Sequence, residues 1–68
     1  MSTSTYTVTG MTCGHCVASV TEEISEIDGV REVAVDLSSG LVTVTSDRPV
    51  APADVRSAVE EAGYRLAA

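Results

Sequence analysis

Almost all of the soft-metal and redox chemistry available to this chain lies in seven consecutive residues, Gly-Met-Thr-Cys-Gly-His-Cys, from Gly10 to Cys16. They contain both cysteines, Cys13 and Cys16, and the one histidine, His15. A Cys-x-x-Cys pair serves as a redox dithiol, as half of a zinc site or as a carrier for a soft metal ion. The rest of the sequence must distinguish these three uses.

The number of available ligands argues against a closed zinc site. Structural zinc takes four ligands, usually Cys and His, whereas this chain offers at most Cys13, Cys16 and His15. Cu(I) is a soft ion that prefers thiolates, and two sulfurs would hold it while leaving it accessible to an incoming ligand. The loop also lacks a carboxylate that would favour Zn(II) or Cd(II).

A thioredoxin-type redox role requires a different setting. That fold is larger than 68 residues, and its Cys-x-x-Cys normally lies beside a Trp and a cis-proline, whereas this chain has no Trp. Neither of its two prolines flanks a strand in the required way. These observations favour soft-metal binding, and they leave a small thiol oxidoreductase and a reduced structural pair as alternatives.

The residues around the loop predict a strand and then a helix. Tyr6 and Val8 alternate with threonines, which predicts a strand over residues 3–9 that Gly10 ends. A helix is expected from about Cys13 to Asp28-Gly29, with Gly29 at its C′ position. Its apolar stripe is Val17, Val20, Ile24 and Ile27. The cysteines then lie at a helix N-terminus, where we expect backbone N–H groups to lower the pKa of the thiols.

The rest of the chain predicts two further strands, a second helix and a short last strand. The strands cover residues 33–37 and 42–45, around a hairpin turn at Ser38-Ser39-Gly40 where Gly40 is free to adopt a positive φ. The helix begins at Pro52 and ends at Gly63, and the last strand covers residues 64–66. The inner stripe of this helix is Val55, Ala58, Val59 and Ala62. The order β-α-β-β-α-β predicts an α+β, ferredoxin-like sandwich, in which two helices cover one face of a four-stranded antiparallel sheet. We expect one domain over residues 1–68.

Composition narrows the possible partners. The net charge is −6, with no Lys, so nucleic acid and anionic membranes are not expected partners. The acidic surface either steers docking onto a basic partner or is simply solvated. There is no signal peptide and no apolar run that could span a bilayer, so we expect a cytoplasmic protein. With only two Tyr as aromatic residues, the core must be aliphatic and rich in Val.

The stretch from Gly10 to Cys16 closely resembles the GMTCxxC signature of heavy-metal-associated domains. The resemblance extends over nearly the whole chain and includes Asp28-Gly29-Val30, Val33-Ala34-Val35-Asp36 and Ala62-Gly63-Tyr64. It implies the fold deduced above and Cu(I) binding by Cys13 and Cys16. It also implies that Met11 packs inward beneath the loop and anchors it.

Two further residues keep alternative interpretations. His15 is an exposed residue that modulates the thiolates, or it is an occasional third ligand, for example in a copper-bridged homodimer. Tyr64 shields the site or hydrogen-bonds near Cys16, or it is a core ring with its hydroxyl in water.

The resemblance implies a bacterial copper chaperone that is not an enzyme. Such a protein would deliver Cu(I) by thiolate exchange to a copper-exporting P-type ATPase, with a copper-sensing repressor as a second partner. The alternative is one metal-binding module of such an ATPase or of a mercuric reductase. Met1 and the short chain make a separate protein the expectation.

Overall fold

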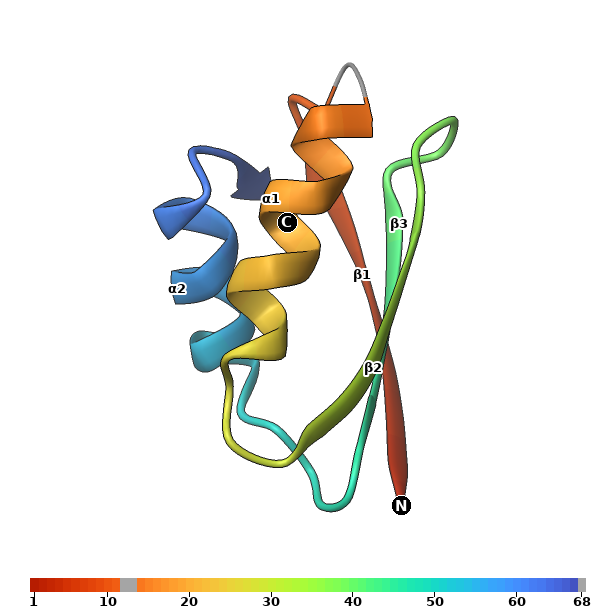
Figure 1. Cartoon of the computed structure of the whole chain (residues 1–68), viewed down its shortest axis with the longest axis vertical. Helices are drawn as coiled ribbons and strands as arrows, with labels where there is room; N and C mark the ends of the chain where they lie inside the picture. Colours follow the sequence, from red (N-terminus) through yellow and green to blue (C-terminus); the bar gives the residue numbers. More distant parts are fainter. Residues whose placement is uncertain (12–13, 68) are drawn as a thin grey trace.

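The computed structural model describes residues 1–11 and 14–67. Its helices and strands follow the predicted β-α-β-β-α-β order (Figure 1). They are β1 (Ser2–Thr9), α1 (Gly14–Ser25), β2 (Val30–Asp36), β3 (Leu41–Ser46), α2 (Pro52–Glu61) and β4 (Arg65–Leu66).

The four strands form one antiparallel sheet in the order β2-β3-β1-β4. β1 pairs with β3 from Ser2 opposite Ser46 to Thr7 opposite Leu41. Its last residues, Val8 and Thr9, pair instead with β4. Both helices cover the same face of this sheet (Figure 1). The ferredoxin-like prediction is therefore confirmed.

The core lies between the two helices and the inner face of the sheet. Val20 and Ile24 of α1 and Val59 of α2 have no exposed surface. The other members of the buried cluster are Val8, Val42, Val44, Val55 and Ala58. All eight are aliphatic, and six are Val, which confirms the expected Val-rich core. Alternation on β3 brings Val42 and Val44 inward because successive side chains of a strand point to opposite faces.

The first helix is shorter than predicted, and Gly29 is not its C′ residue. The helix ends at Ser25, where the backbone N–H groups of Glu26 and Ile27 bond to the carbonyls of Glu23 and Ile24. These i to i−3 bonds tighten the last turn. The carbonyl of Gly29 accepts a hydrogen bond from Asp47 N, at 2.9 Å, so Gly29 belongs to the loops at the far end of the sheet.

The predicted helical stripe is correct only in part. Val20 and Ile24 are buried, while Val17 and Ile27 are half-buried. Cys16, which the prediction assigned to the metal, takes the third buried position on this face of α1. Positions 16, 20 and 24 are spaced four apart, so they lie on one face of the helix.

Three connections meet at one end of the molecule, drawn at the top of Figure 1: the end of β1 with the start of α1, the β2–β3 turn and the α2–β4 turn. The N-terminus lies at the opposite end. No helix in residues 1–11 and 14–67 is both long and apolar enough to cross a membrane.

Candidate metal centre

The candidate centre lies between the last residue of β1 and the first turn of α1. Gly10 follows β1 with a φ of 93°, a left-handed conformation that an L side chain rarely adopts. This turn directs the chain from the sheet towards the start of α1 at Gly14. Cys13, the first expected ligand, lies outside the described residues.

Cys16, the second expected ligand, lies in the first turn of α1 with only 8% of its surface exposed. The first backbone N–H groups of a helix have no acceptor within the helix, and they carry partial positive charge. Such a position would stabilise a thiolate, and the lowered thiol pKa expected from the sequence stays a prediction. The burial of Cys16 was not predicted.

His15 is exposed in the same turn. Consecutive helical residues point about 100° apart around the axis. His15 therefore projects towards solvent while Cys16 projects inward. The two interpretations of His15 both require an accessible ring, which this position provides.

Met11 and Tyr64 are both partly buried beside the ends of the elements that flank the loop. Met11 is half-buried and packs against the core cluster, so its side chain ties the loop to the domain. Tyr64 is also half-buried and packs against the same cluster. A Cβ added to Gly10 would lie 3.4 Å from Cδ1 of Tyr64, so the ring rests on the backbone where β1 ends.

The β2–β3 turn also supports this end of β1, which the sequence analysis missed. Val8 N donates a hydrogen bond of 2.8 Å to the carbonyl of Gly40. A Cβ on Gly40 would lie only 2.5 Å from the carbonyl oxygen of Val8. The available signal was Gly40 itself, since a glycine in a turn permits close backbone approach.

Residues 1–11 and 14–67 contain no group of three or more His, Cys, Asp or Glu side chains that could hold a metal ion. The ligands expected from the sequence stay Cys13, which lies outside the described residues, and Cys16. Thiolates of this kind are the donors that a soft ion prefers.

The model of one protein family, described as the heavy-metal-associated domain, matches residues 5–65. The chain belongs to the heavy-metal-associated domain family. This membership confirms the resemblance stated from the Gly10–Cys16 stretch. The match runs from β1 to β4, so it covers both cysteines and all the neighbours described above.

Three relatives show what this heavy-metal-associated domain is similar to. It is 41% identical to the copper chaperone CopZ of Bacillus subtilis, with 98% of this chain and 99% of that protein covered. It is 38% identical to human copper-transporting ATPase 2, where it covers 93% of this chain but only 4% of that protein. A solved CopZ metallochaperone superposes with a TM-score of 0.90 at 37% identity, covering 97% of this chain and all of the other.

Proposed function

We propose that this chain is a copper metallochaperone, a single domain over residues 1–68 that carries Cu(I) as cargo between Cys13 and Cys16. The observation that supports this most strongly is the position of Cys16. It lies in the first turn of α1, in a domain that matches a copper chaperone over 99% of that relative's length. An ion bound by two thiolates at the N-terminus of a helix has few ligands, so the thiolates of a partner protein can reach it.

Transfer proceeds by exchange of thiolates. Cu(I) between two thiolates carries one net negative charge, which the partial positive charge of the α1 N-terminus offsets in part. A thiolate of the partner forms a Cu–S bond as one Cu–S bond to this chain breaks. A second exchange completes the transfer, and the released thiolates take protons from solvent. Copper stays Cu(I) throughout, so no electron acceptor or donor is needed.

The proposed recipient is a copper-exporting P-type ATPase. Human copper-transporting ATPase 2 contains a region 38% identical to this chain. Two similar domains would meet through equivalent ends, so that the ligands of one lie close to those of the other. The chain would act as a carrier in the bacterial cytoplasm and not as an enzyme. A copper-sensing repressor would be a second recipient. His15 would assist as a ligand in a copper-bridged homodimer, and its exposure supports this role.

Anaerobic Cu(I) titration against a chromophoric Cu(I) chelator tests the proposal. We expect one Cu(I) per chain, and loss of this binding in the double variant Cys13→Ser, Cys16→Ser. His15→Ala and Met11→Leu are matched variants in the same loop, and each should retain stoichiometric binding. Undiminished binding by the double variant would refute the assignment of the ligands.

Two alternatives give different results. A thiol oxidoreductase would turn over in a dithiol-exchange assay and would have no competitive affinity for Cu(I). A module cut from an ATPase would bind Cu(I) equally well, but its reading frame would continue past Ala68 into membrane-spanning segments. Sequencing the locus separates this alternative from a chaperone.

A further inference from the structure

The four arginines of this chain fall into two classes. Arg31 bonds to Asp47, with Nε 2.7 Å from Oδ1, and Arg48 forms an ion pair with Asp28. The guanidinium groups of Arg56 and Arg65 form no ion pair or hydrogen bond with any residue in ranges 1–11 and 14–67. In a chain with ten acidic residues and a net charge of −6, two uncompensated guanidinium groups are a departure that requires an explanation.

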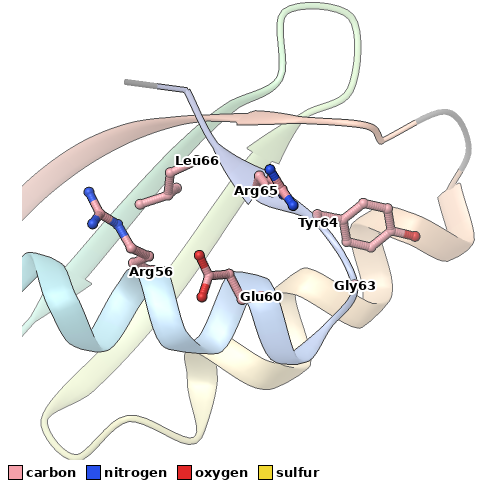
Figure 2. A pocket seen from close by; sticks show the side chains of 6 residues that line it. All are labelled: Arg56, Glu60, Gly63, Tyr64, Arg65 and Leu66. Atoms are coloured by element: carbon pink, nitrogen blue, oxygen red, sulfur yellow. The ribbon is translucent and has the colours of Figure 1, made fainter.

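Both of these arginines line the same cleft, which has a volume of about 560 Å³. Arg56 comes from α2 and Arg65 from β4, so two different elements each contribute one arginine to the cleft. The other lining residues are Glu60, Gly63, Tyr64 and Leu66. Figure 2 shows Arg56 and Glu60 reaching from α2 towards β4, while the Tyr64 ring points away from Arg56 at the other end of the cleft. We call this the α2–β4 cleft.

The α2–β4 cleft adjoins the candidate metal centre through Tyr64. This residue lines the cleft and also lies against Gly10, the first residue of the Gly10–Cys16 stretch, which we call the metal loop. A partner seated in the cleft would therefore hold its own metal ligands near the loop. Thiolate exchange requires this proximity, because Cu–S bonds form only between ligands in direct contact with the ion.

We infer that the α2–β4 cleft is the docking point for a carboxylate-bearing surface of the protein that exchanges copper with this chain. The inference rests on the proposed function and adds to it the chemistry of the recipient. Guanidinium groups bind carboxylates through paired N–H donors. With Arg56, Arg65 and Glu60 the cleft carries a local charge of +1, because it has two cations and one anion.

The hollow between α1 and α2 is negatively charged, in contrast to the α2–β4 cleft on the other side of α2. Its charged lining residues are all acidic: Glu23, Glu26, Asp28, Asp54 and Glu61. An acidic partner is repelled from that hollow and attracted to the α2–β4 cleft. The charge distribution thus selects one orientation of docking, the one that brings the partner to the Tyr64 side of the metal loop.

The test measures copper transfer to the amino-terminal metal-binding domain of a copper-exporting ATPase from the same genome. Cu(I)-loaded wild type and the variants Arg56→Gln, Arg65→Gln and the double variant are mixed with this domain under anaerobic conditions. Exposed charge pairs contribute little each, so we expect about a threefold loss of transfer rate per single variant and about tenfold for the double. The loss should shrink as salt is raised.

Arg31→Gln is the matched control. It removes one arginine and changes the net charge by the same amount, but Arg31 pairs with Asp47 and does not line the cleft. An equal loss in Arg31→Gln and Arg56→Gln would attribute the effect to net charge and overturn the inference. Transfer by the double variant at the wild-type rate would overturn it as well.

Glu60 provides a test in the opposite direction. Glu60→Gln raises the local charge of the cleft from +1 to +2 and should accelerate transfer about two- to threefold. Glu61→Gln changes net charge equally, yet Glu61 lines the acidic hollow on the other side of α2, so it should accelerate transfer less. Equal acceleration by both variants would contradict a local role for the cleft.

The Cu(I) affinity of each variant, measured by chelator competition, separates the inference from the proposed function. If wild type binds no Cu(I), the proposed function fails. If all variants bind Cu(I) equally and differ only in transfer, the inference is supported. Inorganic phosphate provides a last discrimination: if low-millimolar phosphate shifts the amide signals of Arg56 and Arg65 more than chloride does at equal ionic strength, the cleft is a small-anion site and the docking inference is wrong.

Discussion

The ring of Tyr64 lies against the backbone of Gly10, which has a φ of 93°. A Cβ added at Gly10 would lie 3.4 Å from Cδ1 of this ring. This contact places Tyr64, from the α2–β4 turn, beside the turn at Gly10 that follows β1. Two segments far apart in the sequence therefore meet at this point.

We expect Gly10→Ala to destabilise the domain by about 1–3 kcal/mol, because a non-glycine residue at this φ is strained. The variant should also bind Cu(I) less tightly, since the loop must leave β1 in another direction. Thermal unfolding and chelator competition measure the two effects.

Gly14→Ala is the control for this prediction. Gly14 is the first residue of α1, has no positive φ, and no atom of the described residues lies within 4 Å of the position of its Cβ. Ala there should be neutral or slightly stabilising. A similar loss of stability in both variants would contradict the role assigned to the turn at Gly10.

The close approach of Gly40 to Val8 predicts a larger effect. Gly40→Ala combines a strained φ of 74° with a Cβ 2.5 Å from the Val8 carbonyl oxygen, so the β2–β3 turn must move away from β1. We expect a loss of about 3 kcal/mol or more in denaturant unfolding.

Gly63→Ala isolates the contribution of backbone strain. Gly63 has a φ of 95°, but no atom in the part of the chain that the structure describes lies within 4 Å of its Cβ position. It should lose about 1–2 kcal/mol, which is less than Gly40→Ala. If the two variants were equally stable, the clash with Val8 would have no energetic weight.

The β2–β3 turn also predicts a perturbed carboxyl group. The side chain of Ser38, at 2.7 Å, and then its backbone N–H, at 3.0 Å, donate to Oδ1 of Asp36 and hold its pKa below the ordinary value. Because this pKa is lower in the folded state than in the unfolded one, the stabilisation is present above the ordinary Asp pKa. It is lost as the pH falls through the folded-state value.

Carbon-detected NMR titration of Asp36 checks this expectation. Ser38→Ala should raise the pKa of Asp36 towards its ordinary value, because it removes the hydroxyl donor. Ser39→Ala should raise the pKa less, since the contribution of Ser39 to the shift is smaller. A larger rise with Ser39→Ala would show that the hydrogen bonds are assigned to the wrong residue.

Copper should stabilise the folded chain, because a ligand that binds only the native state raises its stability by mass action. Free Cu(I) at 100 times its dissociation constant contributes about 2.7 kcal/mol, which corresponds to a rise of roughly 10 °C or more in Tm for a domain of this size. Anaerobic differential scanning calorimetry measures the shift. The Cys13→Ser, Cys16→Ser variant should show none, and a chelator should reverse the shift in wild type.

Periodicity was sufficient to predict most of the fold. Alternation on β1 and β3 and the stripe of α2 reflect burial directly, so Val8, Val42, Val55 and Val59 are buried as expected. The predicted end of α1 was wrong because Ile27 continues the apolar stripe of the helix although the helix already ends at Ser25. The residues after Ser25 form i to i−3 bonds and then a tertiary hydrogen bond from Asp47 N to the carbonyl of Gly29, which the local sequence pattern does not encode.

The candidate site was predictable in residue type but not in detail. Spacing and resemblance identified Cys13 and Cys16, yet the burial of Cys16 depends on how α1 packs against the sheet. The contacts of Gly10 with Tyr64 and of Val8 with Gly40 join residues far apart in sequence. The sequence likewise does not show that Arg56 and Arg65 line one cleft while Arg31 and Arg48 form ion pairs, because this depends on how the chain folds.

The N-terminus lies at the end of the molecule opposite the start of α1 (Figure 1), where Ser2 pairs with Ser46 in the sheet. A flexible tether attached before Ser2 would therefore leave the start of α1, the β2–β3 turn and the α2–β4 turn facing outward. Several copies linked to a bead or an electrode through the N-terminus would all present this opposite end to the solution. Under the proposed function, the same geometry would suit the chain for use as a surface-bound copper sensor.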